Sequence, residues 1–208
     1  MNIESGLDSG LLRIGLTLSP QARQRLLDYA ALLAKWNRVY NLTAIREPEQ
    51  VLTHHLLDSL VVVPHLDGIT TVADAGSGGG LPGIVLAIAR PSLAVTSIEA
   101  VSKKASFQQQ ARIELGLTNF TVLNERVENV RPETGFDAVI SRAFTELADF
   151  VRLTRHLIHP GGRLLAMKGV RPDAEIARLP EGVRVVETRS LQVPGLGAER
   201  HLVILETD

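Results

Sequence analysis

The spacing of apolar residues divides the chain into a helical first third and a remainder in which strands and helices alternate. Behind the Ser19-Pro20 pair, apolar residues recur every three or four positions and predict a helix with one buried face: Ala22, Leu26, Tyr29, Leu33, Trp36 and Tyr40. A second helix is predicted over residues 48–63, ended by Pro64, with a buried side formed by Val51, His55, Leu56, Leu60 and Val63. Residues 1–66 are therefore expected to form an N-terminal helical cap.

From Ile69 onward, short apolar runs alternate with helical stretches, as a doubly wound parallel sheet requires. Strands are predicted at 69–73, 93–98, 120–123, 136–141 and 163–168, and helices at 84–89, 101–115 and 146–158. Two last runs, 183–187 and 201–205, have no crossover helix between them and predict an antiparallel hairpin at the sheet edge. The expected fold class is α/β: a Rossmann-like, mostly parallel sheet with an antiparallel C-terminal edge hairpin, and residues 67–208 as one compact unit.

A glycine-rich turn follows the first predicted strand, with the pattern D-x-G-x-G-x-G formed by Asp74, Gly76, Gly78 and Gly80. In a parallel α/β sheet, a nucleotide-like ligand binds at the carboxyl end of this strand, where backbone without Cβ atoms can approach it closely. The dinucleotide fingerprint needs a further glycine where this chain has Leu81. The turn therefore predicts a cofactor other than a dinucleotide.

Two carboxylates are expected beside this turn. Asp74 can favour the positive charges of an ammonium and sulfonium cofactor such as S-adenosylmethionine. Glu99 ends the second predicted strand 23 residues after Gly76, near the spacing of about 20 at which an acidic residue binds ribose hydroxyls. The alternative is a tight connection between strand and helix that binds no ligand.

Composition limits the class of protein. With 208 residues, 45% hydrophobic and 22% charged, the chain can form one globular domain with a small extension. It has no cysteine, which excludes disulfides, thiolate metal sites and a cysteine nucleophile. No secretory leader or membrane-spanning run is found, so a soluble, cytoplasmic protein with no membrane partner is expected.

Charge is nearly balanced overall, since the formal net charge is −1, which argues against indiscriminate coating of nucleic acid. Residues 137–171 nevertheless carry six Lys or Arg against three Asp or Glu. Such a patch can hold a phosphate backbone, or it can be a solvated helix face. The His156-x-x-His159 pair has no nearby carboxylate to complete a ligand set, so no metal is expected.

Several sequence blocks, in this order and spacing, resemble one known family. They are Lys35 to Ala44, His55 to Leu60, the glycine turn, Ser141-Arg142-Ala143-Phe144, Met167-Lys168-Gly169 and Glu199-Arg200-His201-Leu202. The family is the bacterial ribosomal RNA small subunit methyltransferase G family, also called glucose-inhibited division protein B. The chain departs from its commoner forms at Ser77, Gly79 and Ala100.

The resemblance implies a class I methyltransferase that uses S-adenosylmethionine to methylate N7 of a guanosine in the decoding-region loop of 16S rRNA. It implies cofactor contacts at Gly76, Leu81, Val127, Glu128 and Arg142. The implied partner is 16S rRNA within the small ribosomal subunit, and the chain is expected to act as a monomer.

The implied reaction needs no catalytic acid or base, because guanine N7 already presents an in-plane lone pair. Holding nucleophile, methyl group and leaving sulfur in line supplies the rate enhancement. Covalent attack on pyrimidine C5 would need a cysteine, which is absent. The Asn/Asp-Pro-Pro-aromatic turn of many exocyclic-amine methyltransferases is replaced here by the block that contains Arg142 and Phe144.

Six residues are candidates for contact with RNA: Asn41, His55, Phe144, Lys168, Arg200 and His201. Each has a structural alternative. Asn41 can cap the turn after its helix, and His55 can be an interior histidine or pair with Asp58. Phe144 can stack on a base or lie in the core, and Arg142 can bind cofactor or phosphate or form an ion pair. The remaining three can clamp phosphates or be solvated ends of strands.

Two other functions remain open from the sequence. One is a ribosome-assembly factor that binds RNA and keeps the methyltransferase fold without turnover. The other is a NAD-dependent reductase, which Leu81 in place of glycine disfavours.

Overall fold

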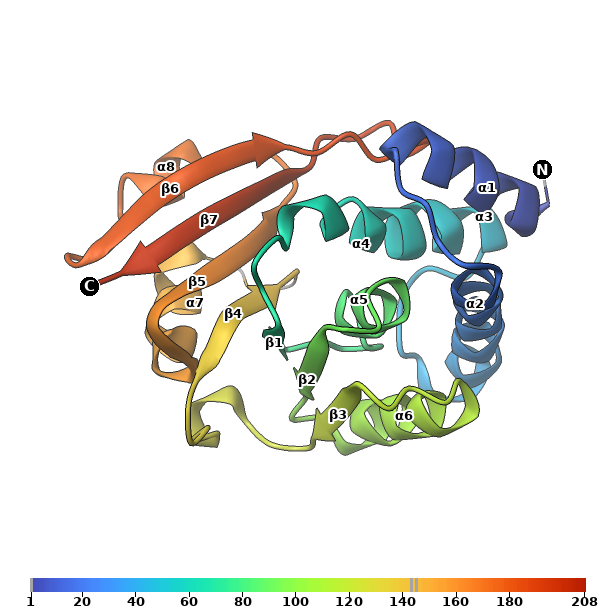
Figure 1. Cartoon of the computed structure of the whole chain (residues 1–208), viewed down its shortest axis with the longest axis horizontal. Coiled ribbons are helices and arrows are strands. Elements are labelled where there is room, and N and C mark those ends of the chain that lie inside the picture. The colour runs from blue at the N-terminus through green and yellow to red at the C-terminus, as the bar shows by residue number, and fades with distance from the viewer. Residues whose placement is uncertain (1, 143, 145) are drawn as a thin grey trace.

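The structure, a computed structural model, describes residues 2–142, 144 and 146–208. These residues form a seven-stranded sheet in the order β3-β2-β1-β4-β5-β7-β6 (Figure 1). The strands are β1 (Thr71–Ala75), β2 (Ala94–Ile98), β3 (Phe120–Leu123), β4 (Phe136–Ser141), β5 (Ile158–Lys168), β6 (Val183–Ser190) and β7 (His201–Thr207). Strands β1 to β5 pair in parallel, and β7 pairs antiparallel with both β5 and β6. The predicted α/β class with an antiparallel C-terminal edge is confirmed.

The helices precede and alternate with these strands. They are α1 (Ile3–Ile14), α2 (Pro20–Tyr40), α3 (Pro48–Val51), α4 (Asp58–Leu60), α5 (Gly83–Ala89), α6 (Ser102–Glu114), α7 (Leu147–Thr154) and α8 (Asp173–Ile176). Short 3₁₀ segments are η2 (Val63–His65), η3 (Val127–Asn129) and η4 (Arg155–Leu157), and η1 (Leu52–Leu57) is π-helical. Helix α2 begins as predicted, because the Ser19 side chain accepts a hydrogen bond from the Ala22 amide at 3.1 Å.

Two predicted helices have different ends. The helix predicted over 48–63 is a continuous run of α3, η1 and α4 that ends at Leu60 and contains a π-helical turn. The helix predicted over 146–158 leaves α-geometry after Thr154, and β5 begins at Ile158. Strand β5 starts early because Ile158 pairs with Phe136 of β4, a long-range contact that helical periodicity does not contain.

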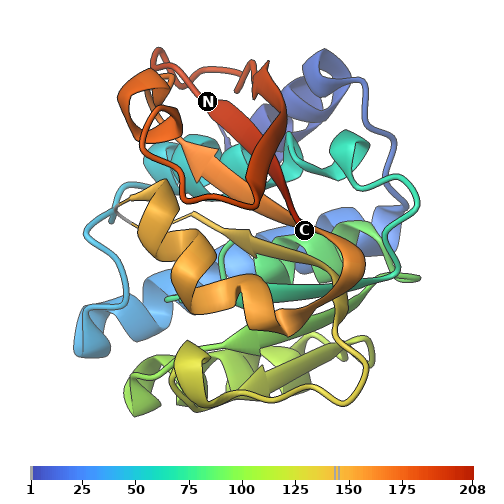
Figure 2. The same ribbon diagram turned by 90° about the vertical axis from the view of Figure 1, so that its left-hand side faces the viewer.

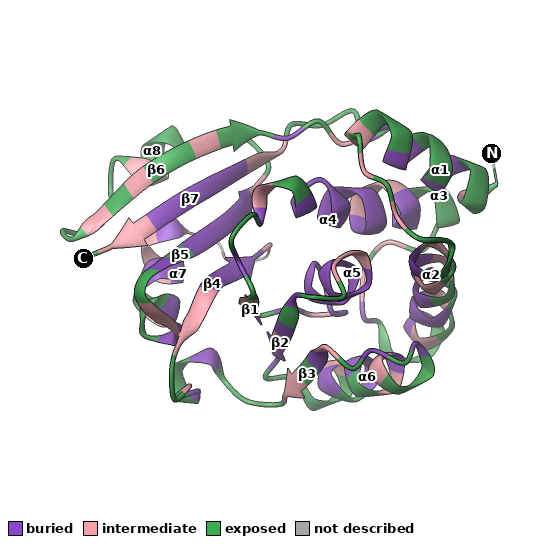
Figure 3. Ribbon diagram, viewed as in Figure 1, coloured by how far each residue is buried: buried purple, intermediate pink, exposed green. Residues whose placement is uncertain are grey.

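Alternate strand residues face two helical layers. On one face, sheet residues such as Val72 and Ile140 share a core with α1 to α6, including Leu26 and Leu56. On the other face, Val139 and its neighbours pack against α7. Figure 2 shows α7 on one side of the sheet and the N-terminal helices on the other. Figure 3 shows buried residues in the second half of β5 and in the middle of β7, whereas β6, at the edge of the sheet, has intermediate and exposed residues. Because cap and sheet share this core, the predicted boundary at residue 66 stays a prediction.

Within the described ranges, every helix is too short or too polar to traverse a lipid bilayer.

Candidate functional site

The predicted cofactor residues gather at the carboxyl edge of the sheet. Gly76 follows β1, Glu99 follows β2, Val127 lies in η3 beyond β3, and Arg142 follows β4. The parallel registers bring these strand ends together, and the Gly76 amide donates to the carbonyl of the last β2 residue at 2.9 Å. Four segments far apart in sequence thus meet where an open α/β sheet places its ligand.

The glycine turn faces open space. Gly76 and Gly78 have φ values of +69° and +58°, a backbone region that other residues rarely adopt. Among the atoms of the described residues, a Cβ added at Gly78 would meet none within 4 Å, and one at Gly76 would meet only Phe144, at 3.9 Å. Gly80 differs, since its added Cβ would collide with Ile84. Gly76 and Gly78 therefore form an open cradle, whereas Gly80 is required for packing.

Asp74 is fully buried at the end of β1, and one of its oxygens lacks a partner. Its Oδ2 accepts from the Gly83 amide at 2.7 Å, at the start of α5, and its Oδ1 makes no hydrogen bond with any of the described residues. Burial raises the pKa of Asp74 to about 7. A buried, unpaired acceptor costs free energy unless a ligand supplies a donor or a positive charge. Asp74 thus fits a cationic cofactor, and its contact with one stays a prediction.

Glu99 is almost fully buried and organises the turn. Its Oε2 accepts from the Gly78 amide at 2.8 Å, and its Oε1 accepts from the Val101 amide at 2.7 Å. The carboxylate therefore holds the glycine turn against the start of α6. Its predicted contact with ribose hydroxyls stays a prediction.

A buried polar cluster beneath the turn is not evident from sequence. The Gln108 side-chain amide donates to the Ser77 hydroxyl at 2.7 Å and to the Gly78 carbonyl at 2.8 Å, and its oxygen accepts from Ser97. The Tyr29 hydroxyl donates to the Gly79 carbonyl at 2.7 Å. These bonds rigidify the turn. The one feature of the sequence that could have indicated this cluster is Gln108, a polar residue on the buried side of the helix predicted over residues 101–115.

The other predicted cofactor residues surround the same edge. Leu81 and Val127 are buried in the core, and Glu128 is exposed beside Val127 in η3. Their contacts with a cofactor stay predictions.

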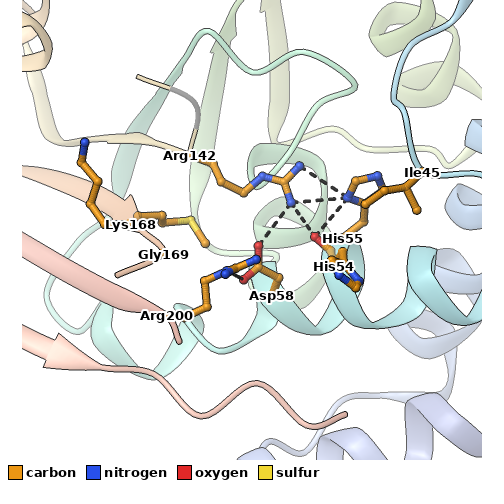
Figure 4. A pocket seen from close by; sticks show the side chains of 9 residues that line it. Ile45, His54, His55, Asp58, Arg142, Lys168, Gly169 and Arg200 are labelled. Carbon is orange, nitrogen blue, oxygen red and sulfur yellow. Dashed lines mark hydrogen bonds and ion pairs between the residues drawn. The ribbon is translucent and has the colours of Figure 1, made fainter. Parts of the chain in front are cut away.

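A pocket of about 340 Å³ lies next to this edge, between the cap and the strand ends (Figure 4). Its lining residues are Ile45, His54, His55, Asp58, Arg142, Met167, Lys168, Gly169 and Arg200. The Arg142 guanidinium donates to the His54 carbonyl at 2.7 Å and to Asp58 Oδ2 at 3.3 Å. His54 lies on η1, a π-helical segment of the kind often found at functional sites, and Asp58 begins α4 directly after it.

His55 matches the interior-histidine alternative. Its Nδ1 lies 3.0 Å from the His54 carbonyl, which can only accept, so Nε2 accepts from the Thr43 hydroxyl at 3.0 Å. Burial, followed by the nearby Arg142 charge, lowers the pKa of His55 to about 4. His55 is therefore neutral. Arg142 Nη1 lies 3.4 Å from His55 Nδ1 and donates to Asp58 Oδ2, so His55 and Asp58 share this arginine as a neighbour.

Three further RNA candidates line or border the pocket. Arg200 donates from Nε to Asp58 Oδ1 at 2.7 Å, and the Lys168 ammonium lies 2.7 Å from Glu175 Oε2. His201 Nδ1 donates to the Gly169 carbonyl at 2.8 Å. The strand ends that carry these residues are thus structured by specific bonds and are not simply solvated.

Asn41 and Phe144 lie in different settings. Asn41 ends α2 in the left-handed conformation and accepts from Arg46 at 2.8 Å, which matches the turn-capping alternative. Phe144 is half-buried with its ring 5.4 Å from that of Phe150. Ala143 and Thr145, which flank Phe144, lie outside the described residues. RNA contact by either residue stays a prediction.

The two histidines considered for a metal lie at the opposite edge. His156 Nε2 is 3.1 Å from the Val130 carbonyl, and His159 Nε2 is 2.9 Å from Asp137 Oδ1. Across the part of the chain that the structure describes, no three potential ligand side chains are grouped to hold a metal ion.

Comparison with known proteins now decides the family. The GidB family profile, described as rRNA small subunit methyltransferase G, matches residues 22–203. The chain belongs to this family. The methyltransferase G of Aromatoleum aromaticum (strain DSM 19018 / LMG 30748 / EbN1) is 72% identical over 204 residues, which cover 96% of this chain and 97% of that protein. The methyltransferase G of Azoarcus sp. (strain BH72) is 60% identical over 199 residues, with 96% and 94% covered.

Solved structures support the fold of this methyltransferase G family member. The glycopeptide N-methyltransferase MtfA, complexed with S-adenosyl-L-methionine, superposes with a TM-score of 0.64 at 11% identity. The match covers 74% of this chain and 95% of that one, and at this identity it shows the class I methyltransferase fold alone.

Proposed function

We propose that this chain transfers the methyl group of S-adenosylmethionine to N7 of a guanosine in the decoding-region loop of 16S rRNA. Methylation of small-subunit rRNA follows from the family, and the fold is that of methyltransferases that use this cofactor. The observation that carries the proposal is the open glycine cradle beside Asp74, whose buried Oδ1 has no partner in the part of the chain that the structure describes. A ligand that combines a nucleoside with positive charge suits both features.

The cofactor would lie along the turn. Because Gly76 and Gly78 have no side chains, the cofactor could approach the protein backbone closely at these two residues. The Asp74 carboxylate would favour the positive charge of the cofactor. We expect Glu99, which follows the neighbouring strand, to accept a hydrogen bond from a ribose that lies across the edge. Bound S-adenosylmethionine supplies an electrophilic methyl group, and the protein supplies its orientation.

Guanine N7 is an acceptor that suits the pocket beside the turn. N7 needs no deprotonation, and both ring nitrogens of His55 are engaged, so this histidine is not free to take up a proton. The Arg142, Lys168 and Arg200 side chains line the pocket and can attract an RNA strand. Alignment of N7 with the methyl group would then supply the rate enhancement, which reaches roughly 7–11 kcal/mol in favourable cases.

The acceptor RNA is expected to be structured. In A-form RNA the major groove that carries N7 is deep and narrow, so the target guanine must lie in a loop or be flipped out. We therefore propose the small ribosomal subunit in the cytoplasm as the substrate, acted on by a monomer of this chain, with short oligonucleotides as poor substrates.

The test is methyl transfer from labelled S-adenosylmethionine to small subunits isolated from cells that lack the modification. We expect one labelled 7-methylguanosine, located by mass spectrometry of nuclease fragments. Subunit and cofactor binding without transfer would favour the assembly factor. Binding of NADH without affinity for S-adenosylhomocysteine would favour the reductase.

A further inference from the structure

Asp58 joins two arginines that come from distant parts of the chain. It lies in α4 of the cap and has 2% of its side chain exposed. Its Oδ1 accepts from Nε of Arg200, which directly precedes β7, at 2.7 Å. Its Oδ2 accepts from Nη1 of Arg142, which directly follows β4, at 3.3 Å. Figure 4 shows Asp58 between the two guanidinium groups at the side of the pocket. One carboxylate of the cap therefore sets the positions of two strand-end cations.

The charge in this cluster does not cancel. Burial of a carboxylate is costly unless cations compensate it, and one cation would suffice for charge balance. Two cations on Asp58 leave one net positive charge beside the pocket. His55 adds none because it is neutral, whereas Lys168 is paired with Glu175. The pocket is thus prepared for an anion.

The arginines keep donors for such an anion. Arg200 uses Nε for Asp58 and Nη1 for the Glu199 carbonyl, and Arg142 uses Nη1 for the His54 carbonyl. Among the described residues, Arg200 Nη2 and Arg142 Nε have no hydrogen-bond partner. About a quarter of each arginine side chain is exposed, 25% for Arg142 and 23% for Arg200, and both line the pocket.

We propose that Asp58 is a positioning residue that holds Arg142 and Arg200 so that they bind a backbone phosphate of the acceptor RNA strand in this pocket. The planar guanidinium fork matches the geometry of phosphate oxygens, and phosphate contacts fix the register of a nucleic acid on a protein. The inference rests on the proposed function, which makes RNA the acceptor. Through these arginines, the cap determines where the target nucleotide lies relative to the glycine turn.

The test combines Asp58→Asn, Arg200→Ala and the double variant. Binding of unmodified small subunits is measured by filter retention without cofactor, across a series of salt concentrations. We expect Arg200→Ala to weaken binding about 10-fold to 100-fold and to reduce the salt dependence by about one phosphate contact. We expect Asp58→Asn to weaken it about tenfold. We expect the double variant to lose less binding free energy than the sum of the two single losses, since part of the effect of Asp58 passes through Arg200 and the rest through Arg142.

Steady-state kinetics distinguish a positioning role from a purely structural one, because a purely structural defect would not raise KM while leaving kcat nearly unchanged. In each variant KM for subunits is expected to rise while kcat at saturating subunits changes less than threefold, roughly 0.6 kcal/mol. Arg200→Lys retains the charge and loses the fork, so its KM is expected to lie between those of the wild type and Arg200→Ala. This variant tests the proposal without altering the buried carboxylate.

Glu206→Gln is the matched control. Glu206 also contacts two arginines, Arg163 and Arg184, but at the other end of β7. Removal of the Glu206 charge in Glu206→Gln is expected to leave subunit binding and the KM for subunits unchanged. Thermal melts establish that each variant is folded, and calorimetric titration with S-adenosylhomocysteine is expected to give similar affinity for Arg200→Ala and the wild type.

The proposal is overturned if Arg200→Ala binds subunits as the wild type does, if the losses of Asp58→Asn and Arg200→Ala add, or if Glu206→Gln weakens binding equally. Failure of the proposed function has a separate signature, because it is seen in the wild type as methyl transfer to another atom or as no transfer. Loss of subunit binding in the Arg200 variants would support the phosphate site in that case too.

Discussion

Two aspartates on neighbouring strands, Asp74 and Asp137, have opposite environments. Asp137 lies at the amino edge of the sheet, where its Oδ2 accepts from the Thr70 amide, the Thr70 hydroxyl and the Thr71 amide at 2.7–2.9 Å. Its Oδ1 lies 2.9 Å from His159. The hydrogen bond from the Thr70 hydroxyl holds the pKa of Asp137 well below its usual range, and the bonds from the Thr70 amide, His159 and the Thr71 amide lower it further. Asp74, at the carboxyl edge, has a raised pKa, and within the described ranges it accepts one hydrogen bond and has one unpaired oxygen.

The different hydrogen bonding of Asp137 and Asp74 indicates different roles, one in the stability of the fold and one in ligand binding. A carboxylate whose oxygens are satisfied by the protein stabilises the fold, whereas one that is buried and partly unpaired marks a place where a ligand completes the bonding. The bonds of Asp137 therefore stabilise the fold at the amino edge, and we propose that the carboxyl edge binds the cofactor.

The largest expected effect is at the glycine cradle. Gly78→Ala is expected to weaken S-adenosylmethionine binding about 100-fold, because the new methyl group occupies space that the cofactor needs. The matched change is Gly161→Ala at the amino edge, where φ is also positive, at +86°, and an added Cβ likewise meets no atom within 4 Å. Both variants carry backbone strain of about 1 kcal/mol. Calorimetric titration checks the affinities, and equal losses in both variants would remove the distinction between the edges.

The next effect is the pH dependence caused by Asp74. A raised carboxyl pKa contributes stability that is present below its ordinary pKa and is lost as pH rises through about 7. Compared with Asp74→Asn, the wild type is expected to lose about 2 kcal/mol of unfolding free energy between about pH 5 and about pH 7. Urea unfolding of both proteins across this range provides the measurement. Parallel pH curves would mean that Asp74 is not strained by burial.

Asp137→Asn is expected to act in the opposite sense. A lowered carboxyl pKa contributes stability above its ordinary value, and this stability is lost as pH falls through the lower folded pKa. At neutral pH the substitution is expected to cost about 1–2 kcal/mol, because bonds to a charged acceptor are lost at a partly exposed site. Cofactor affinity should stay unchanged. A variant as stable as the wild type at neutral pH would contradict the assignment of this edge to stability.

The smallest effect is expected at His159. The Pro160 carbonyl, followed by Asp137, raises the pKa of His159, so its contribution is present below the ordinary histidine pKa and is lost as pH rises through the folded value. His159→Gln should lower the melting temperature slightly in mildly acidic buffer and not at alkaline pH. A loss that is the same at every pH would show that packing, not charge, is responsible.

Local signals allowed much of the fold to be predicted. The Ser19 cap and the apolar stripe behind it define α2, and β3 and β4 have the predicted ends because their apolar runs stop at polar residues. The start of β5 could not be predicted, since it depends on pairing with β4. The π-helical turn of η1 has the same apolar pattern as an α-helix, so periodicity does not reveal it.

The candidate site was predictable only where its motif is local. The glycine turn and Asp74 lie within ten residues of one another, and their chemistry follows from type and spacing. The role of Asp58 does not, because its partners Arg142 and Arg200 are 84 and 142 residues away. Gln108 was equally hidden, since its bonds to the turn depend on how α6 packs.

The most direct test of the account is a crystal structure of the protein with S-adenosylhomocysteine bound. We predict that the ligand lies along the turn from Gly76 to Gly80, with its ribose at Glu99 and its amino-acid end near Asp74. A ligand bound elsewhere, or no bound ligand at saturating concentration, would contradict the assignment of the carboxyl edge as the methyl-donor site.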